Sequence, residues 1–153
     1  MATETFLVLN GPNLNLLGTR EPEIYGTETL SDLQARMHKR AKDLRCAVEF
    51  RQENDEGHLI EAVQSAQGRY SGIVCNPGAY AHYSYALADA ITAVGVPLVE
   101  VHISNTFARE EFRRRSVTAP SALGIVAGLG ITGYELALEA LVGYVRAKPN
   151  LPG

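Results

Sequence analysis

The sequence predicts an α/β fold: a five-stranded parallel sheet with helices on both faces. Short apolar runs typical of fully buried strands alternate with segments whose apolar residues recur at helical spacing. Such alternation predicts parallel strands joined by helical crossovers. The length of 153 residues is enough for one domain with its own core. We therefore expect a flavodoxin-like arrangement and treat residues 1–153 as a single catalytic domain.

Each predicted element has its own pattern. Thr29 and Asp32 resemble a helix N-cap followed by its acidic partner, and apolar residues then recur at helical spacing as far as Leu44. The expected strands are residues 6–9, 47–52, 72–75, 97–101 and 124–127. The other expected helices are residues 59–66, 87–94, 109–115 and 134–145, and residues 148–153 are expected to form a frayed tail.

Composition narrows the functional class. The formal net charge of −3 argues against nucleic acid or an anionic membrane as a partner. Cys46 and Cys75 match neither a metal motif nor a secreted disulfide framework. No signal peptide or apolar stretch of membrane-spanning length is visible, so a cytoplasmic setting is expected.

Three polar segments follow predicted strands, at residues 10–26, 76–82 and 102–105. Parallel sheets bind their ligands outside the carboxyl ends of the strands, so these segments predict an active site at one edge. The first loop, residues 10–26, is long for such a connection, and Gly18 and Gly26 bracket a stretch that could close as a lid. The alternative is a surface loop with incidental polar residues.

Arg20 and Tyr25 are the leading catalytic candidates in the first loop. A tyrosine alone is usually a packing residue, and free tyrosine is a poor base at neutral pH. A guanidinium about 4 Å from a phenolate contributes roughly 4 kcal/mol at an effective dielectric constant of about 20. An arginine-activated tyrosinate is therefore energetically accessible as a general base.

His102 follows the fourth predicted strand, and Glu100 lies two residues earlier on the same side of an extended chain. That carboxylate could orient the imidazole and favour its protonated form, although a purely structural pair is the alternative. Ser104 and the amides of Ile103 and Ser104 could bind a carboxylate as an anion nest.

Asn76 and His82 flank the third polar segment and could bind hydroxyl groups, or could be ordinary turn residues. Arg109 and Arg113 are four residues apart and would share a face of the predicted helix. A solvated helix, salt-bridged through Glu110 and its neighbour, is the alternative for these arginines.

Several features predict that no cofactor or metal takes part. Residues 128–133 match GxGxxG, but no further strand follows to complete a dinucleotide-binding unit, so we interpret them as a turn and helix start. His38 and His58 lie away from the strand ends and lack metal-ligand spacing. None of the three lysines lies at the ligand edge, which argues against a Schiff base.

Two other functional classes fit the fold. A flavin or nucleotide binder would prefer a phosphate-cradling loop rich in Ser, Thr and Gly after the first strand, where this chain has asparagines, a proline, Arg20 and Tyr25. A receiver-like signalling domain would need clustered acids after the first strand and a lysine after the fifth, and both are missing.

Six ordered motifs resemble the type II 3-dehydroquinate dehydratases of the shikimate pathway. The resemblance runs from about residue 6 to residue 145, and six matches in the same order make it more specific than any single motif. The motifs are residues 10–18 (NGPNLNLLG), 20–22 (REP), 25–26 (YG), 76–82 (NPGAYAH), 99–105 (VEVHISN) and 109–113 (REEFR).

The resemblance implies a cofactor-free anti elimination that converts 3-dehydroquinate to 3-dehydroshikimate through an enolate. Tyr25 would be the base, stabilised by Arg20, while Asn13 would help hold a water against the enolate. His102, oriented by Glu100, would be the general acid.

The resemblance also implies substrate contacts and an assembly. The substrate carboxylate would bind Asn76, Ile103 and Ser104, the ring hydroxyls would bind His82 and Arg113, and Arg109 would position the lid. The family forms trimers assembled into homododecamers, in which Asp89 would reach the site of a neighbouring subunit.

Overall fold

The computed structural model describes residues 3–147 and contains one five-stranded parallel sheet, as predicted. The strand order is β2-β1-β3-β4-β5, with every neighbouring pair parallel. The predicted tail, residues 148–153, lies outside the described residues. The strands are β1 (Thr5–Asn10), β2 (Ala47–Gln52), β3 (Gly72–Asn76), β4 (Leu98–His102) and β5 (Gly124–Ala127).

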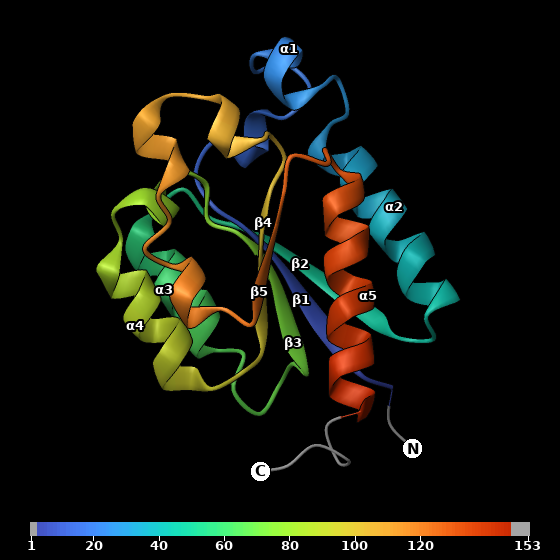
Figure 1. Cartoon of the computed structure of the whole chain (residues 1–153). Helices are drawn as coiled ribbons and strands as arrows, with labels where there is room; N and C mark the ends of the chain where they lie inside the picture. The colour runs from blue at the N-terminus through green and yellow to red at the C-terminus, as the bar shows by residue number, and fades with distance from the viewer. Residues whose placement is uncertain (1–2, 148–153) are drawn as a thin grey trace.

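Helices cover both faces of the sheet (Figure 1). Helices α2 and α5 lie on one face, and α3 and α4 lie on the other. The α-helices are α1 (Pro22–Tyr25), α2 (Leu30–Asp43), α3 (Glu56–Gln64), α4 (Tyr85–Val94) and α5 (Thr132–Ala147). Short 3₁₀ turns are η1 (Leu14–Leu16), η2 (Gly78–His82), η3 (Thr106–Ala108), η4 (Glu111–Arg114) and η5 (Ala119–Ser121).

Strand β1 supplies side chains to both cores because successive side chains of a strand point to opposite faces. Phe6 and Val8 join the core beneath α2 and α5, whereas Leu7 and Leu9 join the core beneath α3 and α4. All four are buried, and complete burial of such a side chain contributes about 1.5–3 kcal/mol. The two-sided burial explains why the strand reads as a continuous apolar run.

Polar caps fix where the helices begin. The predicted Thr29–Asp32 cap is confirmed as a reciprocal capping box, in which the amide of Asp32 donates to Thr29 Oγ1 and the Thr29 amide donates to Asp32 Oδ2. Asp55 accepts from the amide of His58 at the start of α3, and Ser84 caps α4 in the same way. Because Asp55 is the cap, helix α3 begins at residue 56, three residues before the predicted start at residue 59.

The predicted helix over residues 109–115 is wrong. Only the 3₁₀ turn η4 forms there, because the backbone is extended at Arg109 (φ −112°, ψ −163°) and Glu110 (φ −55°, ψ 146°). Arg109 and Arg113 therefore do not share a helical face, and the extended step between the two turns is what brings both side chains over the site.

The GxGxxG segment is a turn between β5 and α5, as interpreted from the sequence. Gly128 and Gly130 have positive φ values of 87° and 61°. A Cβ at Gly128 would also come within 3.2 Å of Asn105 Cα. Across residues 3–147 no helix is long and apolar enough to span a membrane.

Candidate active site

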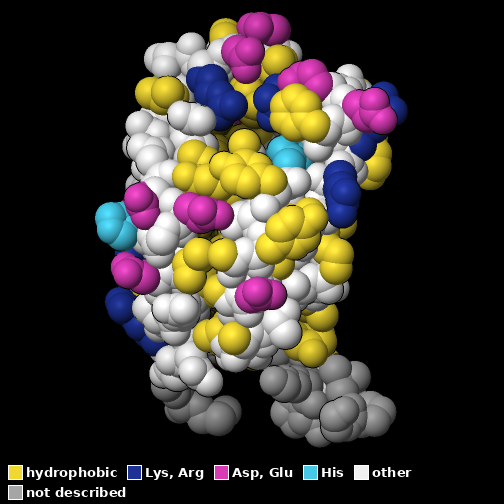
Figure 2. Space-filling view, turned by 90° about the vertical axis from the view of Figure 1, so that its left-hand side faces the viewer, with side chains coloured by type: hydrophobic (Ala, Val, Ile, Leu, Met, Phe, Trp, Pro, Cys, Tyr) yellow, Lys and Arg dark blue, Asp and Glu magenta, His cyan; other side chains and the backbone are white. Residues whose placement is uncertain are grey.

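One cavity at the carboxyl ends of β1, β3 and β4 collects most of the predicted site residues. Figure 2 shows a hollow at the top of one face, with basic side chains on either side and a histidine beside it. Ten of the twelve predicted residues line the cavity: Asn13, Arg20, Tyr25, Asn76, His82, His102, Ile103, Ser104, Arg109 and Arg113. Glu100 lies behind His102, and Asp89 is exposed on α4 and does not line the cavity.

Tyr25 ends the single-turn helix α1, and two guanidinium groups hold its hydroxyl. Nη2 of Arg20 donates to the Tyr25 oxygen at 3.2 Å, and Nη1 of Arg109 donates to it at 2.7 Å. The Arg20 guanidinium also lies 4.4 Å from the centre of the Tyr25 ring. One phenol oxygen thus accepts hydrogen bonds from two guanidinium groups.

Arg109 has a larger part in the site than the sequence indicated. Besides Tyr25, its Nη1 donates to Ser104 Oγ at 3.2 Å, so it joins the first loop to the end of β4. Its Nε is buried, has no hydrogen-bond partner among the described residues and lies 3.8 Å from Glu110 Oε1. The guanidinium thus joins Tyr25, Ser104 and Glu110 at the rim of the cavity.

The first loop holds its shape through residues of unusual backbone conformation. Gly18 and Gly26, the predicted brackets of the lid, have φ values of 94° and 81°, which side-chain-bearing residues rarely adopt. Glu21, at φ 36°, precedes Pro22 at the first position of α1. Figure 1 shows α1 projecting above the sheet, over the strand ends.

His102 ends β4, and Glu100 holds its ring as predicted. The distance from His102 Nε2 to Glu100 Oε2 is 2.8 Å, and both side chains are buried. Because a carboxylate only accepts, Nε2 carries the shared proton and Nδ1 is left for a substrate. The spacing of two residues along a strand is what places both side chains on one face.

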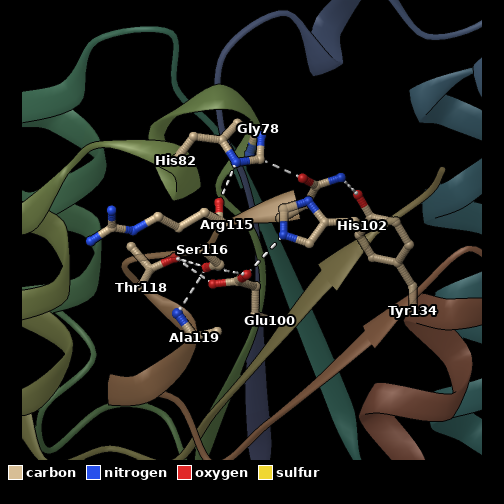
Figure 3. Close-up of polar contacts among 10 residues, drawn as sticks. Gly78, His82, Glu100, His102, Arg115, Ser116, Thr118, Ala119 and Tyr134 are labelled. Carbon is tan, nitrogen blue, oxygen red and sulfur yellow. Dashed lines mark hydrogen bonds and ion pairs between the residues drawn. The ribbon is translucent and has the colours of Figure 1, made fainter. Parts of the chain in front are cut away.

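Two hydroxyl groups complete the surroundings of the Glu100 carboxylate (Figure 3). Ser116 Oγ donates to Oε2 at 2.8 Å, and Thr118 Oγ1 donates to Oε1. Burial opposes ionisation of Glu100, but the hydrogen bond and charge of His102, together with these hydroxyls, hold its pKa below the ordinary value of 4.5. Glu100 is thus a buried anion beside the imidazole.

The segment that carries Ser116 also orients His82. Nδ1 of His82 lies 2.7 Å from the carbonyl oxygen of Arg115, so Nδ1 carries the proton and Nε2 is the free nitrogen. The rings of His82 and His102 are stacked at 6.3 Å with an angle of 19°. One stretch of chain therefore fixes the orientation of both histidines of the cavity (Figure 3).

Asn76, at the end of β3, is held from below by a buried tyrosine. Its Nδ2 donates to the Tyr134 hydroxyl at 2.9 Å, and its Oδ1 accepts from the Gly78 amide at 3.0 Å. The Tyr134 hydroxyl donates in turn to Asn10 Oδ1 at 2.6 Å. Burial raises the pKa of Tyr134, which keeps this hydroxyl protonated.

Asn13 adopts a left-handed conformation, with φ 70°. Its amide donates to Asn54 Oδ1 at 3.0 Å, and Gln52 Nε2 donates to the same oxygen. Tyr80 donates to the carbonyl oxygen of Asn54 at 2.7 Å. Asn54, after β2, therefore fixes the backbone from which the Asn13 side chain projects into the cavity.

Sequence reasoning missed several residues that support the site: Asn10, Asn54, Ser116, Thr118 and Tyr134. Asn10 offered a signal, because it is a polar residue at the end of a buried strand. Tyr134 offered none, because its spacing matched the apolar face of a helix and its partner Asn10 is 124 residues away. Ser116 and Thr118 fell in a stretch with no recognisable pattern.

The other two histidines and the two cysteines do not line the cavity. His38 contacts Phe50 edge to face, and His58 lies near Glu53 and Asp55. Within residues 3–147 no group of three potential metal ligands occurs. Cys46 and Cys75 are both buried.

A second groove, between α2 and α5, is also lined by charged residues, but these pair with one another. Arg36 contacts Glu135 at 2.6 Å and Arg40 contacts Glu139 at 2.7 Å. The charges that line this groove are thus largely neutralised by their own ion pairs.

The comparison with known proteins settles the family. The family model described as "Dehydroquinase class II" matches residues 4–142. The chain belongs to this family. The expected resemblance to the type II 3-dehydroquinate dehydratases is therefore confirmed.

Family relatives match most of the chain. The 3-dehydroquinate dehydratase of Bacillus licheniformis is 56% identical over 133 residues, covering 87% of this chain and 92% of the relative. That of Thermus thermophilus is 59% identical over 136 residues, covering 88% of this chain and 91% of the relative. The crystal structure of the type II dehydroquinase from Propionibacterium acnes has a TM-score of 0.89 at 47% identity, covering 92% of this chain and 97% of that one.

Proposed function

We propose that this class II dehydroquinase dehydrates 3-dehydroquinate to 3-dehydroshikimate, with Tyr25 as the base and His102 as the acid. One observation carries the proposal. A phenol clamped by Arg20 and Arg109 faces the same cavity as an imidazole that a buried carboxylate holds. An elimination needs one group that removes a proton and another that delivers one, and these two side chains are placed to take those two roles.

The first step is removal of the proton next to the ketone. The Tyr25 phenolate takes the proton, and the electron pair of the broken C–H bond forms an enolate on the former carbonyl oxygen. Arg20 and Arg109 stabilise the phenolate before the transfer. Asn13 helps to hold a water that hydrogen-bonds the enolate oxygen, which is an oxyanion-type role.

The second step is loss of the hydroxyl group. Protonated His102 donates its Nδ1 proton to the leaving oxygen as the C–O bond breaks, and the enolate electrons re-form the ketone, now conjugated with the new double bond. Water is released. Glu100 stabilises the imidazolium before the transfer, and the proton gained by Tyr25 must return to His102 before the next turnover.

The remaining cavity residues bind the substrate. Asn76 ends β3, and Ile103 and Ser104 follow β4. These residues bind the carboxylate through side-chain and backbone donors. The free Nε2 of His82 and the Arg113 guanidinium bind ring hydroxyls. No lysine lines the cavity among the described residues, and the proposed route needs no imine and no cofactor.

Assembly and location complete the proposal. The chain forms trimers that assemble into a homododecamer in the cytoplasm, and Asp89 reaches the site of an adjacent copy. Its exposed position on α4, outside its own cavity, is compatible with that role. Sedimentation would measure the assembly, and Asp89→Ala should weaken substrate binding without dissociating it. A monomer with full activity would refute this part.

The direct test mixes the purified protein with 3-dehydroquinate and follows the conjugated enone by ultraviolet absorbance. The proposal expects turnover, and the absence of signal at high enzyme concentration would overturn it. Borohydride added with substrate should leave the enzyme active. Inactivation by borohydride would instead indicate an imine and contradict the proposed route.

A further inference from the structure

The hydrogen-bond chain beneath Asn76 has a fixed direction. Gly78 N–H can only donate, so the Asn76 atom that faces it must be the acceptor Oδ1. Nδ2 then faces the Tyr134 oxygen, which accepts from it and must place its own proton on Asn10 Oδ1. The Gly78 amide and the Tyr134 hydroxyl thus hold the Asn76 amide in one orientation from two sides.

We infer that Tyr134 is a positioning residue for substrate recognition, which makes the Asn76 amide present a donor to the cavity. The inference rests on the proposed function, in which Asn76 binds the substrate carboxylate. One Nδ2 hydrogen is taken by Tyr134, and the second is left for a ligand. A carboxylate is an acceptor only, so this orientation selects an anionic substrate group and disfavours a donor at the same place.

Burial makes the orientation strict. Tyr134 is completely buried, and Asn10 and Asn76 are 1% and 4% exposed, so solvent offers no alternative partner. Figure 3 shows Tyr134 reaching from α5 toward the strand ends, so the C-terminal helix acts on the site from beneath the sheet edge. The hydroxyl itself does not line the cavity, which is why its effect is exerted through Asn76.

Tyr134→Phe tests the inference because it removes only the hydroxyl. The Asn76 amide loses one of its two fixed contacts and can turn, so KM for 3-dehydroquinate should rise about tenfold while kcat stays within about twofold. The variant should also show a weaker preference for 3-dehydroquinate over its carboxamide analogue, measured as the ratio of the two kcat/KM values. A purely structural residue would lower the melting temperature and the active fraction without changing KM or the preference.

Tyr144→Phe is the matched control. Tyr144 lies on the same helix, is partly exposed and lines a groove remote from the site, so its KM should equal that of the wild type. If Tyr134→Phe does not fold, Asn10→Leu replaces it. This variant takes away the acceptor of the Tyr134 proton. The hydroxyl can then turn its proton toward Asn76 Nδ2, which loosens the amide, and KM should rise again.

The outcomes separate the inference from the proposed function. If Asn76→Ala leaves KM unchanged, the proposed carboxylate contact of Asn76 fails. If Asn76→Ala raises KM but Tyr134→Phe and Asn10→Leu do not, only the positioning role of Tyr134 is overturned. A raised KM and a reduced carboxylate preference in both supporting variants would sustain the inference.

Discussion

Tyr25 and His102 face the same cavity, but they are held in different ways. Tyr25 sits on a projecting loop, partly exposed, where two long arginine side chains reach its hydroxyl. His102 ends a central strand, and its partner Glu100 is fully buried, with both carboxylate oxygens engaged by His102, Ser116 and Thr118.

The difference teaches how one small fold holds the two proposed proton-transfer groups in place. The ring of Tyr25 packs against the edge of the core, and hydrogen bonds from Arg20 and Arg109 hold its hydroxyl. In the interior an unpaired charge would be costly, so the proposed acid is held by hydrogen bonds that satisfy Glu100. The proposed acid is therefore part of the folded core, whereas the proposed base is held by side-chain contacts on a projecting loop.

The largest expected effects come from replacing Tyr25 or His102. Both replacements should abolish most of the activity, but only the replacement of His102 should lower the stability. Tyr25→Phe and His102→Ala should each lower kcat by about 10³-fold or more while substrate still binds. Chemical denaturation should separate them. Tyr25→Phe should leave the unfolding free energy nearly unchanged, whereas His102→Ala leaves the buried Glu100 carboxylate without its imidazole partner and should cost about 3 kcal/mol. A fully active Tyr25→Phe would refute the tyrosinate base.

The two arginines around Tyr25 allow a sharper test. Arg109→Gln and Arg20→Gln should each reduce kcat by about 10²-fold, because each removes one cation from the phenol oxygen. Steady-state kinetics measures the loss. The double variant should lose less than the product of the two, because both act on one oxygen. Arg114→Gln, an exposed neighbour outside the cavity, is the control and should be fully active.

On the acid side, Thr118→Val removes one hydroxyl from Glu100 with little change in volume. The carboxylate oxygen is left partly unsatisfied, so unfolding free energy should fall by about 1–3 kcal/mol. Activity should fall by about tenfold, because a loosened Glu100 orients His102 less well. Thermal denaturation and kcat measure the two effects. Equal stability of the variant and the wild type would show that the hydrogen bond from the Thr118 hydroxyl to Glu100 does not stabilise the fold.

The smallest effect concerns acid pH. The pKa of Glu100 is depressed in the folded protein, so its contribution to stability is present above the ordinary value of 4.5 and is lost as pH falls through the lower folded value. Urea denaturation across this window should show wild-type stability declining. Glu100→Gln should start from a lower stability and decline less. A parallel decline in both proteins would assign the acid sensitivity to other carboxyl groups.

Much of the fold could be predicted because it depends on local patterns. The runs around Phe6 and Ile73 are apolar throughout, since both faces of their strands are covered, and the cap at Thr29 needs only Asp32 three residues later. Glu100 and His102 were paired correctly because the two-residue repeat of a strand fixes which side chains share a face.

The failures arose where no local pattern exists. The charged segment from Arg109 to Arg115 has a composition that fits a helix, but an extended backbone at Arg109 and Glu110 limits it to a turn. The sequence grouped Arg109 with Arg113 by spacing, whereas the structure groups it with Tyr25, which is 84 residues away.

The sequence by itself determined the class of fold, the edge of the sheet that carries the site and most of the residues that line it. These follow from periodicity and from the rule that the ends of parallel strands meet. Only the tertiary structure decided what holds those residues: a second arginine on Tyr25, two hydroxyls on Glu100, and Tyr134 beneath Asn76. Hydrogen bonds between distant segments depend on packing in three dimensions, and spacing along the chain carries no record of them.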